Sequence, residues 1–335
     1  MRRIKLPFAG LTIDFVDRES ALKRVFEWAE RGTYPVQVVF GPEGCGKTAW
    51  LRQSAELLKD MGFDVIYFNP VERDVLVELG LHDLKRDFLR LVEELSRQHM
   101  VANIAWSVID FARRAVEHGS KRIAILVDDI FQDIGISKSA TYVKGLLGLL
   151  EHPPREYERI VSVVATSEGI SRREIGKHDW ADLKPMWNMG RDSFEQLYNL
   201  LPDPKPDFEY IWRMTGGNPR YLEQLYKANW IIDKVVEKIV EGKNITPSFV
   251  AKWKRLLEKA VEDPDVLWEP DTPQELVDEL IERNLIVYLL SKRDPWFWVD
   301  TPPPEKDLEL GIGRYVAWQT PLHREAVRKV LEMYN

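Results

Sequence analysis

Cysteine is almost absent from this 335-residue sequence, in which Cys45 stands alone. A single cysteine excludes a disulfide framework and favours a reducing, cytoplasmic compartment. An apolar run of about 18 residues is missing too, so we expect no membrane-spanning helix. The opening stretch MRRIKLPFAG is basic, but no apolar run follows it, and we therefore expect no signal peptide.

An excess of basic charge is also lacking. The formal net charge is −7 and the isoelectric point is about 5.6, which argues against bulk, non-specific binding of nucleic acid. A local basic patch stays compatible with this balance. Because the chain is long and 44% of its residues are hydrophobic, it can bury more than one core, and we expect two or three domains.

Short apolar runs alternate with amphipathic stretches as far as Gly190. The runs predict five strands, at 35–40, 64–69, 122–129, 159–167 and 183–189. Helical spacing between them predicts helices at 19–31 and 48–62 and two more within 83–118. Strands that alternate with helices indicate an α/β fold with a parallel, doubly wound sheet. Pro185 lacks the amide hydrogen that a central strand needs, which predicts a sheet edge for the fifth strand.

Beyond Gly190 the pattern becomes mainly helical. Near the C-terminus, QELVDELIERNLIVYLL predicts a helix that passes into a strand, and DPWFWVD follows as the second strand of a pair. A helix followed by a strand pair indicates a winged-helix module. We therefore expect a sheet domain over 1–191, a helical subdomain over 192–260 and a winged-helix domain over 261–335.

A glycine-rich loop, GPEGCGKT at 41–48, lies between a predicted strand and a predicted helix and matches G-x-x-x-x-G-K-[ST]. Its small residues let successive backbone N–H groups turn inward around phosphate oxygens, and the helix N-terminus adds partial positive charge. Lys47 is expected to reach the β- and γ-phosphates, as a catalytic group, and Thr48 to place its hydroxyl on Mg²⁺. The nucleotide-binding residues predicted from this stretch are Gly41, Pro42, Glu43, Gly44, Cys45, Gly46, Lys47, Thr48 and Ala49.

Two alternatives stay open for this loop. It could be a glycine-rich turn with an exposed lysine, although the motif and its context make that the weaker interpretation. Cys45 is expected to contribute only its backbone N–H, and a reactive thiol there is the less favoured alternative.

Two acidic side chains, Asp128 and Asp129, end the predicted strand 122–129. Ligands of open α/β sheets bind outside the carboxyl ends of the strands. Asp128 is therefore the predicted Mg²⁺ partner, acting through water because Mg²⁺ keeps several waters. Asp129 would orient or deprotonate the attacking water. The alternative is a solvated strand end whose acids cap the next helix, and a slowly hydrolysing switch would have the same residues.

Hydroxyl side chains end the next predicted strand. Thr166 is expected to contact the γ-phosphate or the attacking water, and Ser167 lies beside it, although threonine is also a common strand-end cap. Arg172 and Arg173 follow on the first turn of a predicted helix. Either could act as an arginine finger on a neighbouring subunit, but a solvated basic turn is the favoured interpretation.

The stretch TGGNPR at 215–220 predicts a tight turn and a helix start. Asn218 is a strong N-cap, Pro219 suits the first helical position, and Arg220 then lies on the first turn. With a phosphate loop upstream, Arg220 has a natural target in the γ-phosphate, where it would stabilise charge and distinguish ATP from ADP. A simple helix cap with a surface arginine is the alternative.

Several motifs, FVDRES (15–20), GPEGCGKT, LVDD, VVATS and TGGNPRYLEQL, together resemble the archaeal STAND and origin-recognition-like branch of AAA-type ATPases, as does YVAWQTPLHREAV (315–327). The resemblance implies an AAA-like P-loop ATPase core with five strands, a helical lid and a C-terminal winged helix. It implies that Phe15 and Val16 line the adenine site, that Arg18 and Glu19 fix that segment, and that Pro219 and Arg220 form the lid sensor. Asp17 departs from the motif, which usually has glycine there.

These features predict a cytoplasmic Mg²⁺–ATP-dependent switch ATPase that binds ATP and ADP and a protein partner. The alternative is an ATP-regulated DNA-binding protein, and a weaker one is a module that holds nucleotide without turnover. Residues 251–335 carry 12 Lys and Arg against 17 Asp and Glu, which favours a protein partner over DNA. Small basic patches at Lys292–Arg293 or around Arg324, Arg328 and Lys329 stay open, as does the oligomeric state. The aromatic residues Trp296, Phe297 and Trp298 are expected in packing rather than in base stacking.

Overall fold

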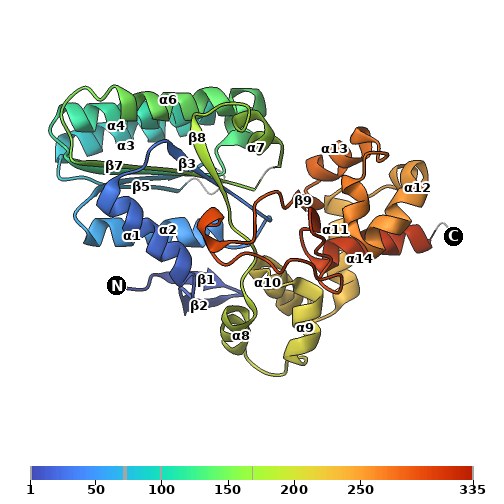
Figure 1. The fold of residues 1–335 in the computed structure, drawn as a ribbon. Coiled ribbons are helices and arrows are strands. Elements are labelled where there is room, and N and C mark those ends of the chain that lie inside the picture. The colour runs from blue at the N-terminus through green and yellow to red at the C-terminus, as the bar shows by residue number, and fades with distance from the viewer. Residues whose placement is uncertain (1, 71–73, 99, 168, 334–335) are drawn as a thin grey trace. The chain divides into compact units, whose positions relative to one another are not determined.

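The computed structural model describes residues 2–70, 74–98, 100–167 and 169–333 (Figure 1). The chain divides into two compact units, each built from more than one segment. The first unit comprises Met1–Ile4, Glu19–Phe40 and Lys47–Lys184, and the second comprises Lys5–Arg18, Gly41–Gly46 and Pro185–Asn335. The unit boundary therefore crosses the glycine-rich loop between Gly46 and Lys47.

A six-stranded, mostly parallel sheet forms the centre of the first unit, in the order β5-β4-β6-β7-β3-β8. Neighbouring strands from β4 to β3 are parallel, whereas β5 runs antiparallel to β4. The strands are β3 (Val36–Phe40), β4 (Asp64–Asn69), β5 (Asp74–Glu78), β6 (Arg122–Asp128), β7 (Arg159–Thr166) and β8 (Ala181–Pro185). The predicted α/β class with its parallel sheet is confirmed.

Two details of the sheet differ from the sequence-based prediction. A sixth strand, β5, adds to the five expected, because an apolar stretch after β4 turns back along the open side of that strand. The strand expected at 183–189 instead spans Ala181–Pro185, so it ends at the proline, which cannot continue a hydrogen-bond ladder. Its position at the edge of the sheet is as predicted.

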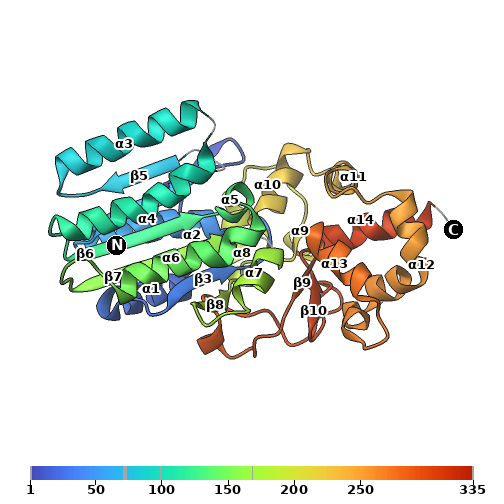
Figure 2. The ribbon, with the colours of Figure 1, turned by 90° about the horizontal axis from the view of Figure 1, so that it is seen from above.

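Helices cover both faces of this sheet. Figure 1 shows α1 and α2 on one face and α3, α4 and α6 on the other, and Figure 2 shows these three side by side. The central strands are buried along nearly their whole length, as expected for a sheet that is covered twice. The helices are α1 (Glu19–Arg31), α2 (Lys47–Asp60), α3 (His82–Arg97), α4 (Val101–Glu117), α5 (Phe131–Ile134), η1 (Ile136–Lys138), α6 (Ser139–Glu151) and α7 (Gly169–Ile175).

The second unit is mainly helical. A short hairpin of β1 (Lys5–Phe8) and β2 (Leu11–Asp14) precedes the glycine-rich loop in the chain, and α14 packs against α9, α11 and α12. The helices are α8 (Arg191–Asn199), α9 (Phe208–Thr215), α10 (Pro219–Lys227), α11 (Ile232–Gly242), α12 (Pro247–Glu262), η2 (Pro264–Trp268), α13 (Gln274–Glu282), η3 (Pro295–Phe297) and α14 (Pro321–Glu332).

The C-terminal strand pair differs in part from the expected one. Helix α13 does pass into β9 (Ile286–Tyr288), but the antiparallel partner is β10 (Val316–Trp318) rather than DPWFWVD. The latter stretch forms η3, because Pro295 has no amide hydrogen and the Asp294 carboxylate caps the turn. Trp298 is buried and Phe297 packs partly buried against the same apolar cluster, whereas Trp296 is exposed, so two of the three aromatic side chains pack as expected. Among the described residues, no helix has the length and apolarity to cross a membrane.

Candidate nucleotide site

The glycine-rich loop follows β3 and leads directly into α2, the strand–loop–helix context that the motif requires. Gly44 and Gly46 have φ angles of +76° and +105°, which glycine adopts without strain. Lys47 is buried as the first residue of α2, and Thr48 and Ala49 follow it partly buried. Cys45 is completely buried and its thiol faces the Met186 carbonyl oxygen at 3.8 Å, which disfavours a reactive thiol.

Close backbone packing explains two of the loop glycines. A Cβ on Gly41 would collide with the carbonyl oxygen of Met186, and Pro42, the next residue, is buried. A Cβ on Gly44 would collide with the side chain of Arg220, whose backbone N–H donates to the Gly44 carbonyl oxygen at 3.4 Å. The loop is therefore packed against residues that lie far ahead in the sequence, within the second unit.

Glu43 has every polar atom bonded. Its N–H donates to Gln319 Oε1 at 2.8 Å, and its carbonyl oxygen accepts from Asn218 Nδ2 at 3.0 Å. Its carboxylate accepts from Arg220 Nη1 at 2.5 Å and from Lys243 Nζ at 2.6 Å. Burial alone would raise the pKa of Glu43, but Lys243 and then Arg220 outweigh it, so the pKa lies below its usual value.

The helix start predicted around TGGNPR is confirmed in its geometry. Asn218 is the N-cap of α10, its side chain accepts from Tyr221 N–H, and Pro219 is the first helical residue. Gly217, at φ +78°, leaves no space for a Cβ beside the Met189 carbonyl oxygen. Arg220 lies on the first turn with its side chain about half exposed and paired with Glu43.

The acidic pair lies at the carboxyl end of β6 in the first unit. Asp128 is completely buried; its Oδ2 accepts from Asn69 Nδ2 at 3.0 Å and from the Tyr67 hydroxyl at 3.4 Å. Its other oxygen, Oδ1, is buried and has no hydrogen-bond partner among the described residues. Burial and then the charge of Asp129 raise the pKa of Asp128 to about 7, although Thr48, Lys47 and Asn69 partly offset this.

The orphaned Asp128 oxygen fits a magnesium ion. A buried acceptor without a partner needs a ligand, and Mg²⁺ binds through one or two carboxylates together with substrate phosphates and waters. No group of three or more His, Cys, Asp or Glu that could hold a metal occurs in the part of the chain that the structure describes.

The polar residues at the neighbouring strand ends are also hydrogen-bonded within the first unit. Asp129 has a left-handed backbone, with φ +46°, and its carboxylate accepts from Ser167 N–H at 3.2 Å. Thr166 is buried and its hydroxyl lies 3.2 Å from the Ser171 hydroxyl. The register pairs Asp128 with Ala165 and Phe40 with Thr166, so these residues end their strands at the same edge of the sheet.

The two arginines of α7 differ in exposure. Arg172 is partly buried, with its guanidinium 4.5 Å from the centre of the Phe40 ring, whereas Arg173 is exposed. The Arg172 contact is a cation–π interaction within its own chain. It favours a structural role for Arg172 over the arginine finger that stayed open from the sequence.

The segment FVDRES has an unusual backbone. Asp17 and Arg18 both have left-handed φ angles, +57° and +62°, a region that glycine adopts without strain. Arg18 is buried, pairs with Asp300 at 2.5 Å and donates to the Cys45 carbonyl oxygen. Phe15 is buried and Val16 partly so, while Glu19 begins α1.

Several supporting residues had no signal in the sequence. Gln319, Lys243 and Asp300 contact the loop or its Arg18 neighbour from positions 200 or more residues away from Glu43 or Arg18. Gln319 lies inside YVAWQTPLHREAV, which the resemblance marked only as a family feature. Asn69 could have been found, because it ends a strand beside the one that Asp128 ends.

The fold and the loop together define a P-loop protein of the α/β class. Residues 15–225 match a family described as an ATPase domain predominantly from Archaea. This match spans more than half of the chain, and the chain belongs to that family.

No curated protein matches the sequence. Three solved structures show what it is similar to. They are AMPPCP-bound DnaA from Aquifex aeolicus (19% identity, 74% of this chain and 75% of that chain, TM-score 0.39), Cdc6p from Pyrobaculum aerophilum (13%, 95% and 94%, 0.39) and the Aeropyrum pernix ORC1 protein in complex with DNA (13%, 95% and 93%, 0.38). At these TM-scores the likeness adds nothing to the family match.

Proposed function

We propose that the protein is a switch ATPase that binds and hydrolyses Mg²⁺–ATP. The observation that carries the proposal is the P loop between β3 and α2, in a chain that belongs to an ATPase family. The buried, unsatisfied oxygen of Asp128 at the carboxyl edge of the same sheet supports it, because that edge is where α/β sheets bind ligands.

The proposed roles follow from the chemistry of each group. Backbone N–H groups of the loop, other than those of Pro42, which has none, and Glu43, which donates to Gln319, bind the phosphates together with the Lys47 ammonium. Thr48 and Asp128 would hold the magnesium ion. Magnesium, when bound, neutralises charge on the phosphate oxygens. Asp129 orients the attacking water, and Thr166 contacts that water or the γ-phosphate.

Phe15 and Val16 are proposed to face the adenine, and Pro219 to contact the nucleotide at the start of α10. Arg220 is the proposed γ-phosphate sensor. In this structure its partner is the carboxylate of Glu43, an anion that offers the guanidinium the same kind of bond as a phosphate oxygen. Arg220 would therefore exchange one anionic partner for another when ATP binds.

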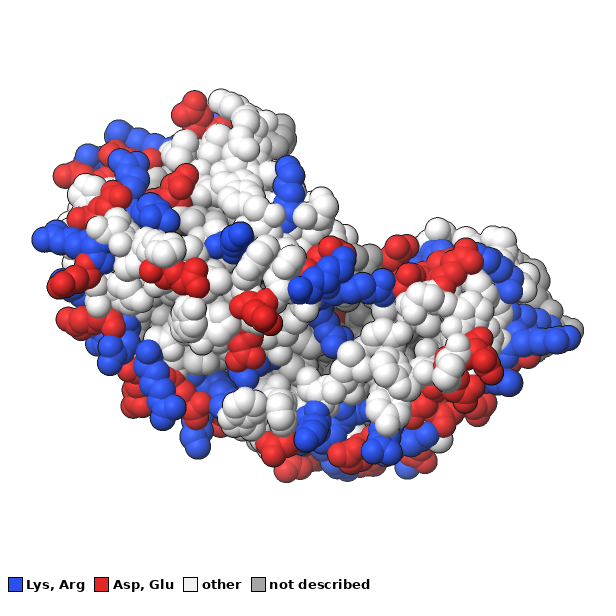
Figure 3. All heavy atoms as spheres, turned by 45° about the horizontal axis from the view of Figure 1, so that its top comes forward, with Lys and Arg blue, Asp and Glu red and all other residues white. Residues whose placement is uncertain are grey.

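In this proposal the nucleotide state governs the helical region 192–260 and the C-terminal region 261–335, which acts as a winged helix that contacts a protein partner. The charge distribution supports a protein partner over DNA. Arg328 pairs with Glu325 and Glu262, and Lys329 with Glu237 and Asp233. Figure 3 shows acidic and basic side chains interspersed on the visible face.

The two other arginines singled out from the sequence also have internal partners. Arg293 donates to backbone carbonyl oxygens, among them those of Leu289 and Arg314, and Arg324 donates to that of Glu309. A guanidinium that bonds its own chain has fewer donors left for a phosphate backbone. The arginines of both patches and Lys329 therefore favour structural roles, whereas Lys292 is exposed.

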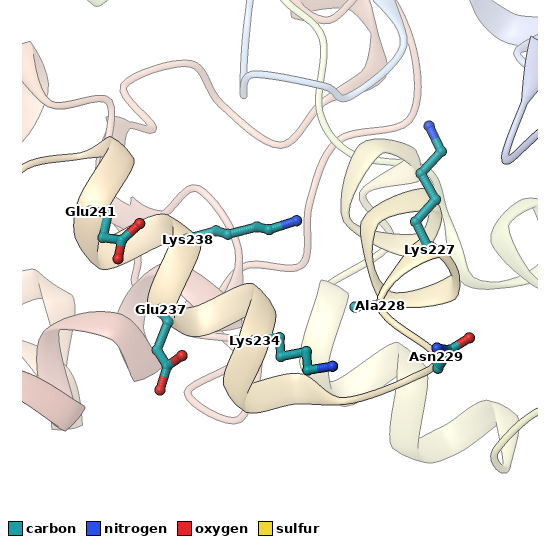
Figure 4. Close-up of a pocket in the computed structure, with 7 residues that line it drawn as sticks. All are labelled: Lys227, Ala228, Asn229, Lys234, Glu237, Lys238 and Glu241. Atoms are coloured by element: carbon teal, nitrogen blue, oxygen red, sulfur yellow. The ribbon is translucent and has the colours of Figure 1, made fainter.

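One hollow favours the alternative of an ATP-regulated DNA-binding protein. Seven residues of α10, α11 and their connection line a cavity of about 390 Å³ (Figure 4). Three of them are Lys227, Lys234 and Lys238, and no ion pair of Lys234 or Lys238 occurs among the described residues. Glu237 and Glu241 also line it, so its charge is mixed. The alternative predicts that Lys234→Ala and Lys238→Ala weaken duplex binding and reduce its salt dependence.

The experiment that tests the proposed function is steady-state ATP hydrolysis with Mg²⁺, comparing the wild type with Arg220→Ala, with and without duplex DNA. The proposal predicts measurable turnover that collapses in Arg220→Ala and does not respond to DNA. Stimulation by DNA would promote the alternative function. Equal rates in both proteins would remove the sensor role and leave Arg220 as part of a helix start.

A further inference from the structure

The backbone of Glu43 is held from both sides by amide side chains of the second unit. Gln319 accepts the Glu43 N–H, and Asn218 donates to the Glu43 carbonyl oxygen. Asn218 also donates to Asn188 Oδ1 at 2.8 Å, and Asn188 Nδ2 donates to the Gln319 carbonyl oxygen at 3.0 Å. The four residues therefore form a closed ring of hydrogen bonds that includes a P-loop peptide.

This ring is buried. The exposed fractions are 2% for Gln319, 3% for Asn188 and 0% for Asn218. A buried amide without its partner is costly, so each member constrains the next, and the ring favours a single arrangement. The conformation of the loop at Glu43 is thus fixed from outside the loop, by side chains from the C-terminal half of the chain.

Gln319 links this ring to the C-terminal elements. It directly follows β10 (Val316–Trp318) and is separated from α14 (Pro321–Glu332) by Thr320 alone, and its own N–H donates to the Leu285 carbonyl oxygen at 2.9 Å. A displacement of the β9–β10 pair or of the start of α14 would move Gln319. Because Gln319 bonds the Glu43 N–H, such a displacement would reach the phosphate loop.

We propose that Gln319 is a positioning residue for the P loop and the contact through which the C-terminal elements and the nucleotide affect one another. The part of this inference that concerns nucleotide rests on the proposed function, whereas the positioning of the loop by Gln319 does not. Coupling between two sites is reciprocal. If Gln319 organises the loop for nucleotide, nucleotide must in turn stabilise the segment around Gln319.

The test uses two substitutions and a matched control in the full-length protein. Gln319→Met keeps the side-chain length and removes the acceptor, whereas Gln319→Glu retains an oxygen that can accept the Glu43 N–H. Gln196→Met is the matched control, because it makes the same glutamine-to-methionine substitution at an exposed position of the same unit. Hydrogen exchange of the loop peptide is measured without nucleotide, and the Kd for Mg²⁺–ATP is measured separately.

In Gln319→Met we expect loop exchange to accelerate and the Kd to rise by about tenfold each, the effect of losing one ordinary hydrogen bond. Gln319→Glu should have loop exchange and a Kd close to the wild-type values, and Gln196→Met should leave both quantities unchanged. A folded Gln319→Met protein with wild-type loop exchange would overturn the proposal. A wild type that binds no nucleotide would instead overturn the proposed function, while the exchange measurement would still decide the role of Gln319.

A second measurement needs no variant. Mg²⁺–ATP added to the wild type should slow hydrogen exchange in residues 316–323 as well as in the loop. Nucleotide binding that protects the loop and leaves 316–323 unchanged would overturn the coupling, even if Gln319→Met fails to fold.

Discussion

The acidic pair and the phosphate loop are held in different ways. Asp128 ends a central strand, and its bonded oxygen contacts Asn69 and Tyr67 on the adjacent strand β4, so the sheet register places it. Glu43 of the loop instead contacts residues between 175 and 276 positions away. A motif at a strand end is positioned by regular structure, whereas a glycine-rich loop depends on packing partners that its own sequence does not identify.

The largest effect on ATP hydrolysis is expected at Asp128, which the regular structure of the sheet positions. Asp128→Asn keeps the side-chain size and the contact with β4 but removes the charge that a magnesium ion needs. We expect kcat for ATP hydrolysis to fall on the order of a hundredfold, with little change in thermal stability. Steady-state kinetics at saturating Mg²⁺ measure this.

Asp133→Asn is the control for Asp128→Asn, because Asp133 is an exposed carboxylate five residues further along the chain. It should have nearly wild-type kinetics. Full activity in Asp128→Asn would show that the Asp128 carboxylate is not needed for hydrolysis, and it would contradict the proposed metal site.

A smaller effect is expected for Gly44→Ala in the loop. The added Cβ would meet Arg220 and would have to adopt φ +76°, a left-handed conformation that costs a non-glycine residue about 1–2 kcal/mol. The loop should change its conformation, and the Kd for ATP should therefore rise by at least about tenfold. Isothermal titration calorimetry measures this. Gly148→Ala is the control, because it lies within a helix and no atom beyond the neighbouring backbone of that helix lies within 4 Å of its Cβ position. Unchanged affinity in Gly44→Ala would mean that the contact with Arg220 does not shape the loop.

A pH-dependent loss of stability is expected from His323 in the second unit. Its ring contacts the hydroxyls of Tyr221 and Thr320, at 3.1 and 2.9 Å. Burial and then Lys243 lower its pKa to about 3, with Arg220 acting in the same direction and Glu43 against it. Because the unfolded chain takes up this proton at about pH 6.5 and the folded chain only near pH 3, stability falls as the pH drops between these values.

The contribution of His323 to this loss should be about 2 kcal/mol between pH 7 and pH 5. Urea unfolding at both pH values, compared between the wild type and His323→Gln, measures it. The wild type should lose more stability than the variant over this interval. Equal losses in the two proteins would show that His323 is not held neutral.

The smallest effect is expected for Arg172→Ala. Loss of the contact with Phe40 should lower the unfolding free energy by about 0.5–1 kcal/mol and change turnover by less than about threefold. Thermal unfolding and ATPase assays over a range of protein concentrations measure both. A loss on the order of a thousandfold, seen only at concentrations at which the protein associates, would instead identify an arginine finger.

Most of the sheet could be predicted because buried strands have continuous apolar runs and end in polar residues. This placed Asp128 and Thr166 at one edge of the sheet, and the N-cap and proline of α10 could be predicted for the same local reason. The strand β5 was missed because an edge strand that pairs on one side has a weaker pattern. The partner of β9 was missed because DPWFWVD is apolar, yet Pro295 and Asp294 make it a turn.

The supports of the loop could not be predicted from the sequence. Gln319, Lys243 and Asp300 are ordinary polar residues in helical or irregular segments, and only the folded chain brings them to Glu43 and Arg18. The backbone conformation at Asp17 could not be predicted from the sequence either. Its side chain departs from the family motif, and only the folded chain shows that its φ angle of +57° is one that glycine adopts without strain.

The most direct test of the central claim is equilibrium binding of Mg²⁺–ATP by the wild type, Lys47→Ala and Lys59→Ala. Both lysines belong to α2, but Lys47 is buried at its start and Lys59 is exposed near its end. We predict saturable binding by the wild type and by Lys59→Ala, and loss of at least about a hundredfold in affinity in Lys47→Ala. Equal affinities in all three proteins, or no binding by the folded wild type, would contradict the claim that GPEGCGKT is a nucleotide-binding loop.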